Sequence, residues 1–472
     1  MFLRYNKILI IFLFGLFAPS LILISELNDD YELKILFLFL SLLIVFLLLI
    51  LFIKETHIIY VKNNLTLCFL FIAFSHTFFR FTIFPITFGL EYNHTLVTAI
   101  LFLFVAVIDF FSNESKAHSY GKNKQRSALI ILTFSSLFSS VLVNYGDFLL
   151  LDGVSKLIIF FLSLYYFCKF IPSKIIENSK VADIFIFLLF SVGTIASVVG
   201  LITVVEPYIN PVNEAPGASI SFFTHPNANA FLYCYSIPCG IYLFFKYYEK
   251  MNVDKKLILV FAILIAVANQ ILTYNRSGLI AVLFGMLVFI YYYNKKLFAV
   301  FLIVLPFAVL LLYQITTAEK GASTVVGRVG LISTGIEMLV NSRKGFLWGF
   351  GIENNFKVFE ETKSFLLFQE EHNYPHNSFL FFILEFGIIT FILVMTFLFK
   401  VIFSSLVRFF KKKLDHIELL SLSIVISVLI QSIFEDFVLF PQFYLFHLFL
   451  IFLGVLVIAN KENVKHNFEK LN

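Results

Sequence analysis

Long apolar stretches, separated by short polar connections, repeat along the whole chain. Most of these stretches are about twenty residues long, which is the length of an α-helix that crosses the hydrocarbon core of a bilayer. Because a backbone that faces lipid must satisfy its own hydrogen bonds, the stretches are predicted to be helices. We place fourteen spans, at residues 8–25, 35–53, 65–84, 95–112, 127–143, 154–171, 182–205, 228–247, 256–274, 277–294, 296–316, 377–403, 416–436 and 440–459. The pattern predicts an all-α, polytopic transmembrane bundle of 12–14 spans.

The composition agrees with this class of protein. Hydrophobic residues make up 60% of the 472 residues, charged residues make up 14%, and the mean hydropathy is +0.92. A soluble domain is about half apolar and about a quarter charged, so most of this surface is expected to face hydrocarbon. The four cysteines fall inside apolar stretches without metal-ligand spacing, which favours small buried hydrophobes. The first stretch lacks a clear small-residue cleavage site, so we interpret it as a retained helix.

The charges in the connections predict an orientation. With the N-terminus in the cytoplasm, the connections on that side are rich in Lys and Arg, including the run Lys411 to Lys413, and the opposite ones are acidic. This alternation supports an even number of spans and two cytoplasmic termini. Three regions follow: residues 1–316 with eleven spans, residues 317–376 as one large periplasmic loop, and residues 377–472 with three spans and a short cytoplasmic tail.

The connection at residues 317–376 is much longer than the others, and long connections in compact proteins often carry function. A stripe at helical spacing predicts a short amphipathic helix in it, formed by Ile332, Ile336, Leu339 and Val340. Arg343 and Lys344 follow on its polar side. The pattern is typical of a helix in the membrane interface, apolar face down. A helix that packs over the bundle with its basic residues toward headgroups would have the same pattern.

Two arginines are candidate phosphate ligands. Arg276 lies in the short turn between two spans, and Arg328 lies near the start of the predicted loop helix. A guanidinium binds phosphate oxygens in a bidentate fork, and the N-terminus of a helix favours an anion. For Arg276 the alternative is a side chain that extends to the headgroups.

Polar residues also stand at the mouths of two spans. His376 and Asn377 come directly before the twelfth span, and a histidine takes up a proton near neutral pH, so His376 is a candidate catalytic base. His225 and Asn227 stand before the eighth span. They are either ligand-binding residues or a helix start with Pro near the first position and Asn as the cap.

Three further features complete the set of candidate residues. Trp348, the only tryptophan, stands beside two glycines and is either a membrane anchor or a platform for a sugar. His376 and a nearby histidine lack a third ligand at suitable spacing, so no metal site is predicted. Glu385, Lys156 and Arg80 lie within or near spans, where they are expected to form charge pairs inside the bundle.

Together these residues resemble the O-antigen ligase and O-antigen polymerase superfamily of bacterial membrane glycosyltransferases. The pattern of that family near the end of its large periplasmic loop is His, then Asn, Ser or Gln, nine residues, Gly, two residues, and Gly, Thr or Tyr. The stretch from His376-Asn377 to Gly387 and Thr390 fits it in full. Over residues 222–403, three weaker likenesses accompany this motif: Arg276 after a Thr-x-Asn turn where the family has Thr-x-Ser, Arg328 at the loop helix, and Gly349 with Gly351 as a Gly-x-Gly.

The resemblance implies transfer of a whole glycan from an undecaprenyl diphosphate carrier to an acceptor hydroxyl at the periplasmic face of the bacterial inner membrane. The acceptor is lipid A–core for a ligase and a growing glycan for a polymerase. The implied roles are a diphosphate clamp for Arg276 and Arg328 and a base for His376. Neither cofactor nor metal is expected. The candidate substrate-binding residues are Asn377, His225, Asn227, Arg343, Lys344 and Trp348.

Other functions fit parts of the pattern. A lipid-linked oligosaccharide flippase or transporter also handles a diphosphate, but it needs charges distributed through the midplane of the membrane. A protein O-oligosaccharyltransferase differs only in its acceptor. Membrane lipids are expected partners in every case, and nucleic acid is not.

Overall fold

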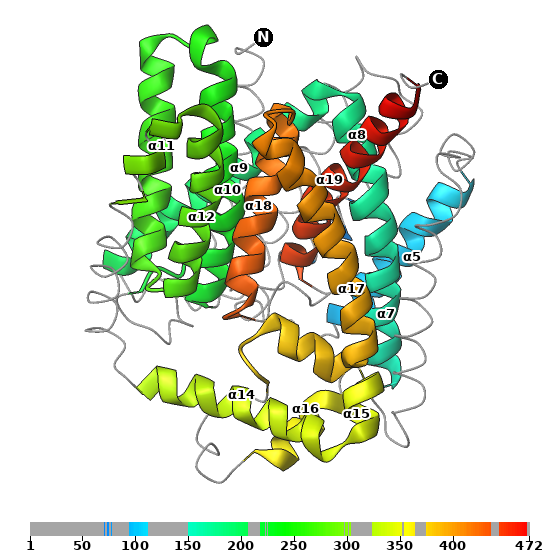
Figure 1. The fold of residues 1–472 in the computed structure, drawn as a ribbon. Helices are drawn as coiled ribbons and strands as arrows, with labels where there is room; N and C mark the ends of the chain where they lie inside the picture. The colour runs from blue at the N-terminus through cyan, green and yellow to red at the C-terminus, as the bar shows by residue number, and fades with distance from the viewer. Residues whose placement is uncertain are drawn as a thin grey trace, which may run out of the picture.

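A computed structural model gives the fold (Figure 1). It describes residues 94–111, 150–205, 225–296, 323–351, 354–363, 374–435 and 443–469. It also describes residues 70, 73, 74, 77, 218–221, 223, 298–300, 302 and 303. The described chain is helical and contains no strand. Its principal helices are α5 (His94–Phe111), α7 (Leu150–Tyr165), α8 (Ile171–Glu177), α9 (Ser179–Val205), α10 (Pro226–Tyr247), α11 (Val253–Leu272), α12 (Arg276–Tyr293), α14 (Ser323–Asn341), α15 (Arg343–Trp348), α16 (Asn354–Thr362), α17 (Ser378–Phe410), α18 (His416–Ser432) and α19 (Tyr444–Glu469). A π-helical turn, η3 (Tyr166–Phe170), joins α7 to α8, and a 3-10 turn, η5 (Tyr248–Lys250), ends α10.

Six of these helical segments are long and apolar enough to cross a membrane, within the part of the chain that the structure describes. They are Ile158–Glu177, Ser179–Val205, Pro226–Lys250, Val253–Leu272, Arg276–Tyr293 and Ser378–Phe410. Shorter apolar helices lie at Thr95–Ala106, His416–Ser432 and Tyr444–Asn460. These nine helices agree with nine predicted spans. The predicted spans at 8–25, 35–53 and 127–143, and most of those at 65–84 and 296–316, lie outside the described residues, so the count of fourteen stays a prediction.

Helix α10 forms the centre of the bundle, and its side chains are buried on all sides over most of its length. It packs against α9, α11, α12 and α18. A helix in such a position must pair its polar groups with its neighbours. The hydroxyl of Tyr235 donates to the backbone oxygen of Leu445 at 2.8 Å, and the Cys234 thiol donates to Gln431 Oε1 at 2.8 Å. By contrast, α11 exposes large apolar side chains along much of its length, as a helix that faces lipid does.

Small residues bring α12 and α18 close together. A Cβ on Gly285 would lie 2.1 Å from Ser427 Oγ, and the hydroxyl of Ser423 donates to the Gly285 oxygen at 2.8 Å. Membrane helices commonly pack in this way, because small side chains let backbones approach and hydroxyls bond across the contact. The two helices therefore form a rigid pair. The start of α12 and the end of α18 lie at the same face of the bundle.

Helix α17 is broken at Gly387, whose φ of 78° and ψ of 167° are not helical. Its first segment lies across the end of the bundle, and the second runs along the other spans (Figure 1). The break frees backbone oxygens for the loop. The nitrogen of Phe350 donates to the Leu384 oxygen at 2.7 Å, and that of Gly351 donates to the Glu385 oxygen at 3.2 Å. The predicted twelfth span thus begins with a segment that holds the loop.

The buried charges predicted inside the bundle are partly found. Lys156 on α7 and Glu385 on α17 are 5% and 2% exposed, and their charges interact. Because the interior of a bundle solvates ions poorly, such groups occur there in pairs. Arg80 lies outside the described residues.

Helix α14 lies across the end of the bundle at a steep angle to the spans (Figure 1). The predicted loop helix is therefore confirmed, with two corrections. It extends back to Ser323, so Arg328 lies more than one turn inside it and not at its N-terminus. The predicted stripe also divides, because Leu339 packs inward with Leu331 and Met338, whereas Ile336 and Val340 are 51% and 75% exposed.

The two ends of the bundle differ in chemistry. The end opposite α14 carries exposed lysines between helices, at Lys295, Lys296 and Lys411 to Lys413. These are the lysines that the positive-inside rule assigns to the cytoplasm. A buried pair ties this end together, since Arg408 Nη2 lies 2.6 Å from Glu418 Oε2. The orientation itself stays a prediction.

Replacing Gly387 with alanine should destabilise the protein. A Cβ there would lie 2.3 Å from the Leu347 oxygen, and the backbone conformation alone costs a non-glycine residue about 1–3 kcal/mol. We expect a lower thermal unfolding midpoint in detergent, measured by differential scanning fluorimetry. Ile392→Ala, at a site 56% exposed on the same helix, is the control. Equal midpoints for Gly387→Ala and the control would show that the break in α17 does not hold the loop.

Candidate functional site

A buried carboxylate lies at the centre of the candidate site. Glu435 follows α18 and is fully buried. Its Oε1 accepts hydrogen bonds from Arg328 Nη2 at 2.9 Å and from Asn275 Nδ2 at 3.4 Å, and its Oε2 accepts one from Asn227 Nδ2 at 3.0 Å. A buried charge is costly unless it is paired and hydrogen-bonded, and both conditions are met here. We call these four residues and His376 the Glu435 cluster.

The start of α17 is attached to the same residue through its backbone. The nitrogen and the hydroxyl of Ser378 donate to the Glu435 oxygen at 3.1 Å and 2.6 Å. Asn377 caps α17 by accepting from the Leu380 nitrogen, and its Nδ2 donates to the Ile433 oxygen at 2.7 Å. These bonds fix the chain directly after the predicted base, and they use the Asn377 side chain for structure.

His376 faces the carboxylate. Its Nδ1 lies 3.7 Å from Glu435 Oε2, which is longer than a hydrogen bond but close enough for the carboxylate to attract a protonated ring. The residue is 8% exposed, and its ring meets Tyr374 edge-on at 5.5 Å. Of the two ring nitrogens, Nδ1 is the one that lies near the carboxylate.

The chain before α10 contributes through Asn227. His225 is the N-cap of α10, because its Nδ1 accepts from the Asn227 nitrogen at 3.1 Å, and Pro226 occupies the first helical position. A helix start was thus correctly foreseen, but the cap is the histidine. The Asn227 side chain is left to donate to Glu435 and to accept from Asn275 Nδ2 at 2.6 Å.

Arg276 opens α12 next to the Glu435 cluster. The residue before it, Asn275, caps the helix by accepting from the Gly278 nitrogen at 2.6 Å and belongs to the cluster through its amide. Arg276 is half-buried. The fold therefore brings the helix start that carries Arg276 and the segment of α14 that carries Arg328 to the same carboxylate.

Arg343, Lys344 and Trp348 lie elsewhere. They belong to α15, beyond the far end of α14, and the thirteen residues from Arg328 to Asn341 span about 20 Å at 1.5 Å per residue. A single diphosphate cannot bridge that distance. The structure thus brings the predicted residues of the loop to two separate places.

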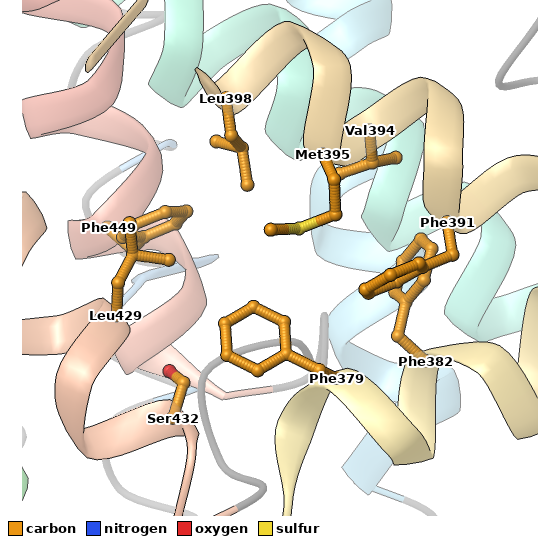
Figure 2. Close-up of a pocket in the computed structure, with 9 residues that line it drawn as sticks. All are labelled: Phe379, Phe382, Phe391, Val394, Met395, Leu398, Leu429, Ser432 and Phe449. Atoms are coloured by element: carbon orange, nitrogen blue, oxygen red, sulfur yellow. The ribbon is translucent and has the colours of Figure 1, made fainter. Parts of the chain in front are cut away.

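A small apolar cavity lies beside the site, between α17, α18 and α19 (Figure 2). Its lining is Phe379, Phe382, Phe391, Val394, Met395, Leu398, Leu429, Ser432 and Phe449. The cavity volume is about 10 Å³, which is close to the minimum for one water molecule. It is a gap in packing and too small to hold a lipid chain or a sugar.

The family model described as O-antigen ligase matches residues 260–395. This match supports the O-antigen ligase superfamily for that part of the chain. No curated protein matched it. The match supports a membrane glycosyltransferase-like function and a lipid-linked glycan as substrate.

The O-antigen ligase match covers only part of the site. Arg276, Arg328 and His376 fall inside residues 260–395, whereas Asn227 and Glu435 fall outside. The hydrogen bonds of Glu435 join the two sets. The site of this O-antigen ligase-like chain is therefore larger than the matched domain.

Two members of the Glu435 cluster were not foreseen from sequence. Asn275 was noted only as a departure from a family pattern. Glu435 was placed at the end of an apolar span, and an ionisable residue in a span is by itself a signal of function. That signal was available in Ser432-Ile433-Phe434-Glu435, although no partner can be named from it.

A double-mutant cycle on Arg328 and Glu435 should show coupling. Removing either charge takes away the other's ion-pair partner. Each of Arg328→Gln and Glu435→Gln should therefore destabilise the wild-type protein more than it destabilises the protein that already carries the other substitution. Arg328 is 39% exposed, which places the coupling in the lower part of the about 0.5–3 kcal/mol range for contacting residues. Equilibrium unfolding in mixed micelles measures it. Arg328→Gln with Glu337→Gln, an exposed acid on the same helix, is the control cycle and should be additive. Additivity in both cycles would contradict the pairing.

Proposed function

We propose that the chain transfers a glycan en bloc from an undecaprenyl diphosphate carrier to an acceptor hydroxyl at the periplasmic face of the bacterial inner membrane. The observation that supports this most is the Glu435 cluster, in which a guanidinium, a carboxylate and an imidazole lie together at one end of the bundle. That arrangement fits chemistry on a substrate whose reacting atoms lie at the membrane surface. A transporter would need such charges along its path through the midplane.

Arg276 and Arg328 are the proposed clamp on the donor. When the bond between the anomeric carbon and the phosphate oxygen breaks, its electron pair stays on the diphosphate, whose charge grows. Guanidinium groups placed beforehand stabilise that charge more in the transition state than in the ground state. Arg328 gives Nη2 to Glu435 and Nη1 to the Phe434 oxygen, yet it is 39% exposed, so part of its donor fork faces outward.

His376 is the proposed base. Its Nε2 accepts the proton of the acceptor hydroxyl as the oxygen forms its bond to the anomeric carbon. The ring then carries a positive charge, which the carboxylate of Glu435 at 3.7 Å stabilises. Glu435 is a positioning residue in this scheme, because it orients the imidazole and one arginine without touching the substrate.

Reconstitution tests the proposed function. The full chain in nanodiscs, given an undecaprenyl diphosphate-linked oligosaccharide, should transfer the glycan to lipid A–core if it is a ligase and lengthen the glycan if it is a polymerase. Transfer should persist in EDTA, because the donors around Glu435 and the charge of Arg328 disfavour a bound cation. Loss of transfer on chelation, restored by zinc or magnesium, would contradict the metal-free mechanism. Transport without transfer, or transfer only to a protein, would replace this function with a flippase or a protein oligosaccharyltransferase.

Arginine variants should separate charge from geometry. Arg276→Lys and Arg328→Lys keep the charge but lose the bidentate fork, so we expect transfer to fall by about 10²–10³-fold. His376→Ala should lose transfer but still bind the donor, because the clamp is intact. Binding and transfer are measured together, with Lys296→Ala, an exposed site at the other end, as the control. Near wild-type transfer by both lysine variants would exclude the clamp, and unchanged transfer by His376→Ala would exclude the base.

A further inference from the structure

Helix α14 has three faces and not two. One face packs on the protein through Leu331, Met338 and Leu339. A second is polar and exposed, formed by Ser333, Glu337 and Asn341. The third is apolar and exposed, formed by Val329, Ile336 and Val340 at 62%, 51% and 75% exposure. One face of this helix therefore packs on protein, and its polar face is suited to water. Its remaining apolar face is suited to the membrane interface.

The third face continues onto α15 and forms a groove. Phe346 and Leu347 are 42% and 41% exposed. With α14 they line an open groove of about 530 Å³, and the lining is Ile336, Leu339, Val340, Arg343, Phe346 and Leu347. This volume is far above the roughly 30 Å³ that one water occupies in the liquid. Among the described residues that line it, Arg343 is the charged one, and Lys344 beside it is exposed.

We propose that this groove, which we call the α14–α15 groove, binds an anionic phospholipid of the adjacent leaflet. An acyl chain lies against the apolar side chains, and the phosphate lies at Arg343. Two observations favour a lipid as the occupant. The groove lies at the end of a bundle of membrane-spanning helices, on a helix that runs across that end (Figure 1). Its apolar floor and guanidinium rim complement the two parts of a phospholipid.

The proposal gives α15 a role separate from glycan transfer. Arg343 and Lys344 lie about 20 Å from Arg328 along α14, so they act on membrane phosphates while the Glu435 cluster acts on the substrate. Because Arg328 belongs to the same helix, a lipid in the groove also holds that arginine at the level of the headgroups. The lipid contact does not depend on the proposed reaction.

The single tryptophan of the chain makes the contact measurable without chemical labels. Trp348 follows Leu347 on α15. With the full chain in nanodiscs, bromines near the headgroup end of the acyl chain should quench Trp348 more than bromines near the chain end, because the helix lies at the interface. Quenching by aqueous iodide alone, with none by brominated lipid, would overturn the proposal.

Two double variants test which face meets the lipid. Trp348→Phe with Val340→Trp places the only tryptophan on the exposed apolar face, and Trp348→Phe with Glu337→Trp places it on the polar face one turn away. We expect brominated lipid to quench the first and iodide to quench the second. Equal quenching of the two by lipid would show that α14 does not present this face to the membrane.

Arg343→Gln tests the phosphate contact. In nanodiscs with a brominated anionic phospholipid diluted in a zwitterionic one, quenching of Trp348 should exceed that from the same fraction of brominated zwitterionic lipid. Arg343→Gln should abolish this preference, and Lys357→Gln, an exposed lysine of α16, should keep it. A preference unchanged by Arg343→Gln would exclude the phosphate contact. No step of the test measures transfer, so its failure is distinct from failure of the proposed function.

Discussion

The carboxylate of Glu435 is the group on which the arrangement of the site end depends. It is fully buried, and an unpaired charge in such a place would cost several kcal/mol. Its partners come from the start of α10, the turn before α12 and the second turn of α14, and its backbone oxygen accepts from Ser378 at the start of α17. Satisfying one anion thus places three segments, and the backbone oxygen of the same residue places the fourth. This placement brings the candidate arginines and the histidine together.

The break in α17 is the second constraint, and it acts on backbone groups. A continuous helix would use the oxygens of Leu384 and Glu385 internally, but the conformation of Gly387 releases them for Phe350 and Gly351. The glycines permit this close approach, since a Cβ on Gly349 would lie 2.3 Å from the Glu385 oxygen. The two glycine patterns that carried the family resemblance are therefore in contact with each other.

The sequence predicted the helices and their class well, because hydrophobic length determines which segments span a bilayer. It also singled out Arg328 and His376, which the structure brings to the same carboxylate. It did not predict Glu435, since the residues that hydrogen-bond its carboxylate are 107 to 208 residues away and no local pattern encodes such contacts. The break at Gly387 was hidden inside a long apolar run, where hydrophobicity is the same for a bent and a straight helix. For α14, the helical periodicity indicated which residues are apolar. It did not indicate which of them pack on protein, because the buried and the exposed apolar faces repeat with the same period.

The carboxylate of Glu435 and the break in α17 hold the same loop at two separate places. Arg328 on α14 is bonded to Glu435, whereas Phe350 and Gly351, just after α15, are bonded to the break in α17. Between these attachments the loop helices have little freedom to tilt, and the apolar face of α14 is presented in a fixed direction. Arg328, held in this way, is already ordered before a charged headgroup binds. Less of the binding free energy is therefore lost to conformational entropy. The groups of the Glu435 cluster are likewise positioned within the protein itself, by the carboxylate and by the backbone of α17.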